Sequence, residues 1–132
     1  VMVQKEVAER FGAKENSKDY GVSTIMINYQ ADVKYLRTVG RKMFTPPPNV
    51  DSALIKITPN EKKEKAKDEE FFVKLVKASF SMRRKTLQNN LLSISIPKEK
   101  TVEALRMLSK PETTRAEELS ISEFISLSNF LN

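Results

Sequence analysis

The apolar positions near the start of the chain follow a helical spacing. Every fourth residue from Val3 to Phe11 is apolar, which favours a helix that stops near Gly12. A polar loop follows, and Asp19 is positioned to cap a second helix that runs to about Gln30. The first thirty residues are therefore expected to form two helices.

The pattern then changes to alternation. Residues 31–40 and 50–57 place apolar side chains at every second position, which is typical of strands. Between them lies Phe44-Thr-Pro-Pro-Pro-Asn49, where three prolines remove backbone donors and fix φ. We therefore expect two strands joined by a rigid proline loop.

Residues 60–70 carry nine charges in eleven positions and predict a linker or domain boundary. Beyond it the apolar period is helical over residues 71–80, 87–92 and 101–108, with a break around 94–97. Ser120 and Glu123 have the spacing of a capping box. It opens a last helix whose inward side chains are expected to be Ile121, Phe124, Ile125, Leu127 and Phe130. The pattern indicates the end of an α/β unit followed by a small helical bundle.

Composition excludes several kinds of chemistry. The 132 residues contain no histidine and no cysteine, so a Ser-His-Asp triad, a cysteine nucleophile and the usual zinc sites are ruled out. The three glycines are too far apart for a phosphate-binding glycine loop. The net charge of +6 favours a polyanionic partner such as nucleic acid. No apolar run reaches the roughly 18–20 residues of a membrane span, and an intracellular protein is expected.

The strongest charge cluster is Ser-Met-Arg-Arg-Lys-Thr at residues 81–86. Three adjacent cations cannot all be buried, and their spread over successive positions suits a phosphate backbone. The alternative is a solvated helix end where the cations offset the helix dipole.

Phe44 is the second candidate, because an aromatic ring on a rigid loop can stack on an unpaired base. The alternative to base stacking is that Phe44 is a core residue packed at the end of the hairpin. Asp51 could be a cap or a polar contact, and nothing local decides between them. The pair Glu117-Glu118 is interpreted as solvated surface.

Several of these segments together resemble the ribosomal RNA adenine dimethyltransferase family. The resemblance rests on Val3-Gln-Lys-Glu-Val-Ala-Glu-Arg10, Lys18-Asp-Tyr-Gly21, Phe44-Thr-Pro-Pro-Pro-Asn-Val-Asp-Ser-Ala53, Arg83-Arg-Lys-Thr-Leu87 with Asn89, and Arg115-Ala-Glu-Glu-Leu-Ser120. It implies a parent enzyme that uses S-adenosylmethionine to dimethylate N6 of two adjacent adenosines. These would lie in the 3′ hairpin of small-subunit rRNA, modified in the cytoplasm during ribosome biogenesis.

The resemblance also implies that the chain is the C-terminal part of such an enzyme. Residues 1–59 would be the end of a Rossmann-like methyltransferase domain, with its two strands as antiparallel neighbours, and residues 60–132 a helical RNA- and ribosome-binding domain. The first helix has no capping residue before Val1 and is expected to be cut. The family's cofactor and catalytic motifs are not in the chain, so it is expected to be inactive alone and to bind no S-adenosylmethionine.

Roles carry over from the family to positions of this chain. Phe44 would stack on the flipped adenine, because N6 is inaccessible until the base leaves its stack. Residues expected to shape the loop are Pro46, Pro48 and Asn49, and those expected to contact RNA are Arg83, Arg84, Lys85, Lys5 and Arg10.

Two alternatives stay open. The chain could belong to the antibiotic-resistance branch that methylates large-subunit RNA, or it could be an RNA- or ribosome-binding module without catalysis. A DNA-binding protein lacks support, because no recognition-helix signature is present.

The expected partners are small-subunit rRNA and the assembling small ribosomal subunit. Strand edges left unpaired are also expected to pair between molecules or leave residues 1–58 partly disordered.

Overall fold

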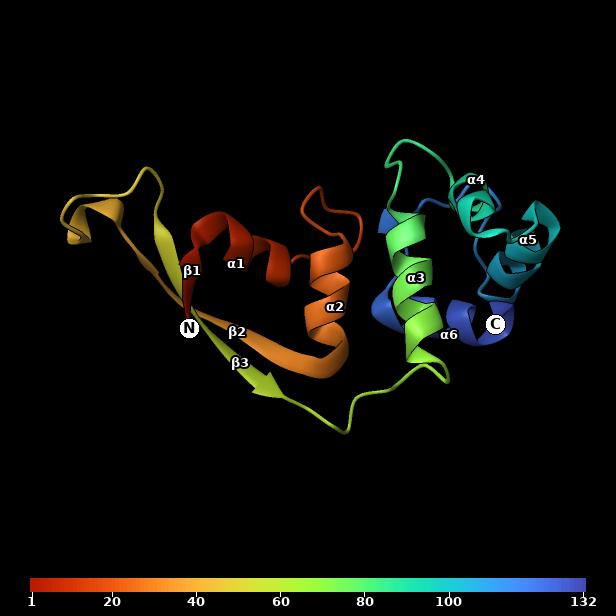
Figure 1. Ribbon diagram of the computed structural model, residues 1–132, viewed down its shortest axis with the longest axis horizontal. Coiled ribbons are helices and arrows are strands. Elements are labelled where there is room, and N and C mark those ends of the chain that lie inside the picture. The colour runs from red at the N-terminus through yellow and green to blue at the C-terminus, as the bar shows by residue number, and fades with distance from the viewer. The chain divides into compact units, whose positions relative to one another are not determined.

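The computed structural model describes all residues from 1 to 132, and the chain divides into two compact units (Figure 1). Unit 1 is Val1–Lys63 and unit 2 is Glu64–Asn132. Unit 1 contains β1 (Met2–Gln4), α1 (Lys5–Phe11), α2 (Val22–Gln30), β2 (Ala31–Val39) and β3 (Ser52–Pro59). Unit 2 contains α3 (Glu69–Ser79), α4 (Leu87–Asn90), α5 (Lys98–Met107) and α6 (Ile121–Leu131).

The sheet of unit 1 is antiparallel throughout, with strand order β1-β3-β2. The expected pairing of the two longer strands is confirmed, and its register places Val33 opposite Ile57 and Val39 opposite Ser52. A bulge between Tyr35 and Arg37 shifts this register.

The expectation of a helix from residue 3 is wrong for its first turn, because Met2–Gln4 pair with β3. Val3 lies opposite Ala53, and its side chain packs with Ala8 and Ile55 in the core of the unit. A single inward strand residue followed by a helix reproduces the four-residue spacing that the sequence shows.

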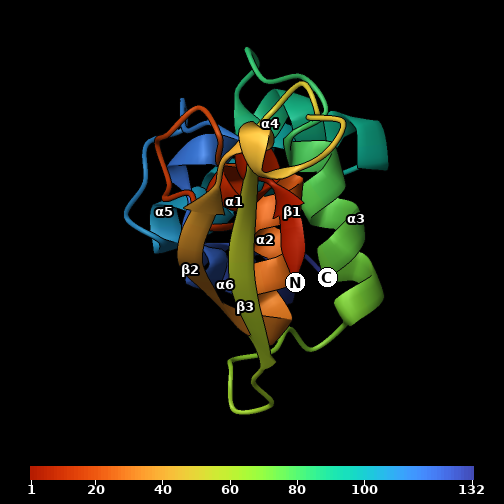
Figure 2. The same ribbon diagram turned by 90° about the vertical axis from the view of Figure 1, so that its left-hand side faces the viewer.

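The two helices of unit 1 lie on the same face of the sheet (Figure 2). Thr24 joins them, since its hydroxyl donates to the Arg10 carbonyl oxygen at 2.6 Å. The Asn28 amide donates to the Phe11 carbonyl oxygen at 2.7 Å. The expected cap at Asp19 is wrong, because α2 begins after Gly21, whose N–H donates to the Thr24 hydroxyl at 3.2 Å.

Unit 2 is helical, and its α-helices are linked by short 3₁₀ segments at Leu91–Ile94 and Ala116–Glu118. The core is built from the apolar stripe of each helix. Its fully buried large side chains are Phe72, Leu75, Val76, Leu87, Leu91, Leu105, Leu119, Phe124 and Leu127. The Phe80 and Phe124 rings contact each other with centroids 5.9 Å apart.

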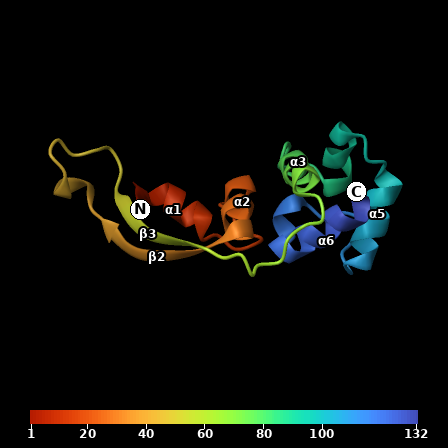
Figure 3. The same cartoon turned by 60° about the horizontal axis from the view of Figure 1, so that its bottom comes forward.

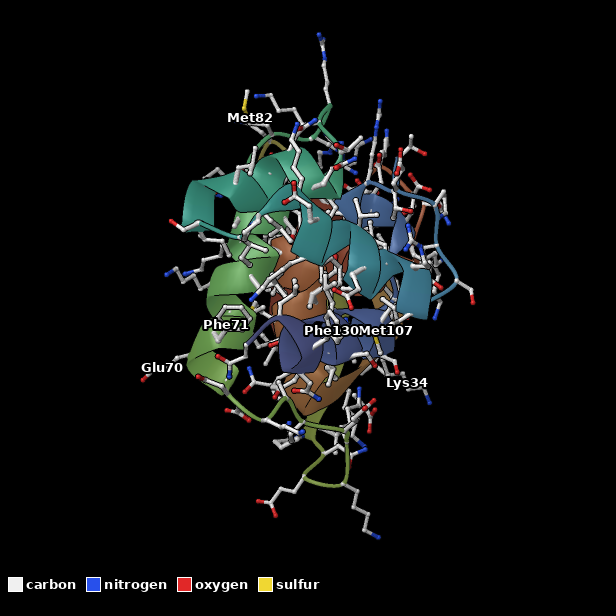
Figure 4. The ribbon with its side chains drawn as sticks, turned by 90° about the vertical axis from the view of Figure 1, so that its right-hand side faces the viewer. Lys34, Glu70, Phe71, Met82, Met107 and Phe130 are labelled. Atoms are coloured by element: carbon white, nitrogen blue, oxygen red, sulfur yellow. The ribbon has the colours of Figure 1, made fainter.

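The capping box at the last helix is confirmed. The Glu123 N–H donates to Ser120 Oγ at 3.2 Å, and the Ser120 N–H donates to Glu123 Oε1 at 2.9 Å. The inward placement of Phe130 is wrong, because its side chain is 39% exposed. Phe130 follows Phe124 by six residues, which turns it about 240° around the helix axis and away from the buried stripe. It lines a shallow cavity together with Met107 of α5 (Figure 4).

The charged segment between the units is tied down on both sides. The Lys63 ammonium donates to the carbonyl oxygens of Asn28 and Ala31 at 2.8 and 2.7 Å, so Lys63 belongs to unit 1. Glu64, the next residue, accepts a hydrogen bond from Ser122 Oγ at 3.2 Å within unit 2. The division between the compact units falls after residue 63, inside the charged segment of residues 60–70, because the residues directly after β3 are held by α2.

None of the helices combines the length and the apolar character that crossing a membrane requires.

Candidate nucleic-acid interface

The three consecutive cations lie in the loop of residues 81–86, called the basic loop, between α3 and α4. Arg83, Arg84 and Lys85 are all exposed. Because α3 ends at Ser79, the cations lie beyond its last turn and in a loop of their own. Figure 4 shows Met82, the neighbouring residue, pointing outward from this loop; it is 53% exposed. The loop therefore presents three positive charges to solvent at adjacent positions.

A buried asparagine anchors the basic loop. Asn90 of α4 is 4% exposed, and its amide donates to the carbonyl oxygens of Ser79 and Met82, both at 2.9 Å. Its Oδ1 accepts a hydrogen bond from Ser81 Oγ at 3.3 Å. Asn90 was not predicted from the sequence, although its spacing from Leu87 places it on the buried face of the helix.

The segment of residues 112–118, which leads to the last helix, holds the other end of the basic loop in place. The Leu87 N–H donates to the carbonyl oxygen of the buried Thr114 at 2.8 Å, and Gln88 donates to the Glu112 carbonyl oxygen at 3.1 Å. The basic loop is thus fixed at both ends by hydrogen bonds to the backbone.

Arg83 forms an ion pair with Glu117 of this segment. Its Nη2 lies 3.3 Å from Glu117 Oε2, with side-chain exposures of 46% and 23%. Glu118 accepts a hydrogen bond from the Arg115 N–H at 3.1 Å. The interpretation of Glu117-Glu118 as solvated surface is therefore wrong, because both are half-buried and each has a polar partner. A partly exposed ion pair of this kind contributes only about 0–1 kcal/mol, so a phosphate group can compete for Arg83.

The second candidate, Phe44, lies in the loop of residues 40–51, called the proline loop, which joins β2 to β3. The proline loop extends beyond the strands, at the end of the sheet opposite α2 (Figure 3). Phe44 is half-buried, while Pro46, Pro48 and Asn49 are exposed.

Arg41 closes the proline loop. Its backbone N–H and its Nε both donate to Asp51 Oδ1, at 2.8 and 3.2 Å, and its Nη1 donates to the Asn49 carbonyl oxygen at 2.8 Å. The pKa of Asp51 is lowered from its ordinary value, first by the Arg41 N–H, then by the guanidinium, with a smaller contribution from the charge of Lys5. Asp51 is thus a polar contact that joins the two ends of the loop.

The remaining predicted RNA contacts lie on α1. The Lys5 N–H donates to the Asp51 carbonyl oxygen at 3.0 Å, so Lys5 adjoins the base of the proline loop. Arg10 is at the other end of the helix and pairs with Glu6 at 2.9 Å. Lys5 and Phe44 therefore belong to one region of unit 1, whereas the basic loop belongs to unit 2. The chain has no group of three or more acidic, histidine or cysteine side chains that could hold a metal ion.

Comparison with protein families gives one match over the whole chain: the family model described as ribosomal RNA adenine dimethylase matches residues 1–132. Two curated relatives are both named ribosomal RNA small subunit methyltransferase A. The one from Cytophaga hutchinsonii is 44% identical over 131 residues, which are 99% of this chain and 48% of the relative. The one from Geobacillus thermodenitrificans is 46% identical over 137 residues, covering 99% of this chain and 46% of the relative. The chain spans about half the length of the curated relatives it matches.

Solved structures show a similar fold. A dimethyladenosine transferase from Plasmodium falciparum superposes with a TM-score of 0.77 at 28% identity, over 96% of this chain and 54% of that one. The 23S rRNA methyltransferase ErmE superposes with a TM-score of 0.65 at 21% identity, over 98% of this chain and 52% of that one. The second likeness concerns the fold alone.

Proposed function

Because this chain belongs to the ribosomal RNA adenine dimethylase family, we propose that it is the RNA-recognising, C-terminal part of an enzyme that dimethylates N6 of two adjacent adenosines. The substrate would be the 3′ hairpin of small-subunit rRNA, with S-adenosylmethionine as methyl donor, in the cytoplasm during assembly of the small ribosomal subunit. The names of the curated relatives support the small-subunit substrate over the large-subunit alternative.

The two units take different parts in this proposal. Unit 1, with helices on one face of an antiparallel sheet, is assigned to the end of a Rossmann-like methyltransferase domain. Unit 2, which is helical, is assigned to RNA and ribosome binding. The likeness to the Plasmodium falciparum dimethyladenosine transferase over 96% of the chain supports reading both units together as parts of one enzyme.

The observation that carries the RNA-binding role is the basic loop: three exposed cations on a backbone that Asn90 fixes in place. Phosphate groups along an RNA strand lie a few ångströms apart, so adjacent cations can each neutralise one of them. A loop that is already ordered loses little conformational entropy when RNA binds. Arg84 and Lys85 form no ion pair within the chain, which leaves their charges available to a ligand.

Phe44 is proposed to stack on the target adenine after that base leaves its stack. Half-burial fits this role, because part of Phe44 remains open to a ligand. Base-aromatic stacking contributes about 1–3 kcal/mol per base. The proline loop would thus supply the contact with the base, while the basic loop supplies contacts with phosphates.

The residues of this chain do not fit S-adenosylmethionine. A nucleotide-binding turn needs glycines where the backbone approaches the ligand closely or takes a positive φ. None of the three glycines has a positive φ, and a Cβ added at Gly21 or Gly40 would meet nothing within 4 Å. We therefore assign the methyl donor to other parts of the enzyme and expect no methyl transfer by these residues alone.

The test is a salt series of binding between the chain and the small-subunit 3′ hairpin, with a scrambled hairpin for comparison. Arg84→Ala should weaken binding and reduce the slope of log affinity against log salt by about 0.7–0.9 for one lost phosphate contact. Lys74→Ala is the matched control, because Lys74 is an exposed cation on α3 in the same unit. It should leave the slope unchanged.

Each outcome decides one part of the proposal. Equal slopes for the Arg84 and Lys74 variants would remove the role of the basic loop. Tighter binding to a large-subunit target hairpin would favour the antibiotic-resistance alternative. Incorporation of labelled methyl groups by the chain alone would overturn the assignment of the methyl donor to other parts of the enzyme.

A further inference from the structure

The proline loop has few hydrogen bonds of its own. Its backbone bonds are those from Met43 to the Gly40 carbonyl oxygen at 3.0 Å and from Phe44 to the Arg41 carbonyl oxygen at 3.3 Å. The prolines that follow have no N–H to donate. The stretch from residue 45 to 50 donates no backbone hydrogen bond to the rest of unit 1. These two short-range bonds do not connect the loop to β3 or to α1, so another contact must fix the position of Phe44 relative to the rest of unit 1.

Three hydrogen bonds from Arg41 supply that restraint. They run from the first turn of the loop to Asp51 and to the Asn49 carbonyl oxygen, ten and eight residues further along. Asp51 is itself fixed, since its carbonyl oxygen accepts the Lys5 N–H at 3.0 Å. Arg41 thus ties both ends of the loop to the start of α1, and Phe44 lies inside the closed segment.

We propose that Arg41 and Asp51 are positioning residues for base recognition: their contact holds the proline loop, and with it Phe44, in the conformation that receives an unpaired base. This inference rests on the proposed stacking role of Phe44. Neither residue needs to touch the RNA. When only a fraction of the molecules has a competent loop, the apparent affinity for the base falls to that fraction of its full value.

The competing explanation is that Arg41 binds a phosphate directly. The two explanations differ for Asp51. If Arg41 acts as a bare charge, removal of the Asp51 carboxylate should tighten RNA binding because a negative charge is lost. If the contact holds the loop, removal of either partner should impair recognition of the base. They also differ for Arg41→Lys, which keeps the charge but cannot make the same set of hydrogen bonds.

The experiment compares the affinity of the chain for an RNA hairpin with adenosines in its loop and for the same hairpin with one of these adenosines replaced by an abasic site. The ratio of the two affinities reports contact with the base and cancels contacts with phosphates. Arg41→Ala, Arg41→Lys and Asp51→Ala should each lower the ratio about tenfold, if the competent loop falls to about a tenth of the molecules. Arg37→Ala removes an exposed arginine of β2 and should leave the ratio unchanged.

Phe44→Ala separates failure of this inference from failure of the proposed function. A ratio that Phe44→Ala lowers but the Arg41 and Asp51 variants do not would overturn the positioning role alone. A ratio unaffected by Phe44→Ala would overturn the stacking role and the inference together. Tighter binding of Asp51→Ala, with rescue of binding by Arg41→Lys, would establish the direct phosphate contact instead. Far-UV circular dichroism of each variant checks that unit 1 is folded.

Discussion

Replacing Asn90 with alanine tests whether the basic loop is held by a buried side chain. The substitution removes the hydrogen bonds to the carbonyl oxygens of Ser79 and Met82, both 2.9 Å long, and the bond accepted from Ser81. Each lost bond costs about 0.5–1.5 kcal/mol, and a carbonyl left without a donor in a buried site costs more. We expect the free energy of unfolding of unit 2 to fall by about 2–3 kcal/mol.

Thermal unfolding followed by circular dichroism measures this effect. Unit 2 spans residues 64–132, a size at which 1 kcal/mol shifts Tm by about 4–8 °C. The Asn90→Ala variant should therefore unfold at least about 8 °C below the parent chain. Asn89→Ala is the control, because Asn89 is exposed and its one side-chain bond goes to Thr86 Oγ1 at 3.0 Å. A Tm shift no larger for Asn90→Ala than for Asn89→Ala would refute the anchoring role.

Three further outcomes are expected. Leu105 is 0% exposed, and Leu105→Ala should lower the free energy of unfolding of unit 2 by about 2–5 kcal/mol in urea. Leu92 is 48% exposed, and Leu92→Ala should lower it far less. Similar losses of unfolding free energy in the two variants would contradict the assigned core. Ser120→Ala should cost about 1 kcal/mol through the lost cap, with the exposed Ser126→Ala as a neutral control in the same melts. The pKa of Asp51 is lowered in the folded chain, so its contact stabilises the proline loop above the ordinary value of 3.8 and is lost as pH falls through the folded-state pKa. Amide shifts of the loop in an NMR acid titration should move together below that pH, and shifts that move at neutral pH would contradict this sign.

Local patterns were enough to predict most of the regular structure. Alternation predicted β2 and β3, helical spacing predicted α3, α5 and α6, and the Ser120–Glu123 spacing predicted a cap that is present. The helices and the cap depend on residues within one or two turns of each other, and the alternation of each strand is visible within its own eight or nine residues.

Contacts between distant residues could not be predicted in the same way. β1 exists because it pairs with a strand some fifty residues later, and nothing within Met2–Gln4 distinguishes it from the first turn of a helix. Arg41 and Asp51 are ten residues apart across a loop, and Arg83 reaches Glu117 from another segment of the chain. At the candidate site the exposed cations were visible in the sequence, whereas the residues that position them were not predicted. For Asn90 a signal was present, because its spacing from Leu87 places it on the buried face of the helix, but it was not used.

The tethering of two consecutive residues to different units has a consequence for recombining related sequences. Lys63 bonds to Asn28 and Ala31, while Glu64 bonds to Ser122. A chimera joined at the peptide bond between residues 63 and 64 keeps each of these contacts within one parental sequence. A crossover after residue 59 would instead bring Lys63 from one parent and its ion-pair partner Asp32, 3.2 Å away, from the other. Exchange of the helical half between relatives should therefore succeed most often when the crossover falls at that one bond.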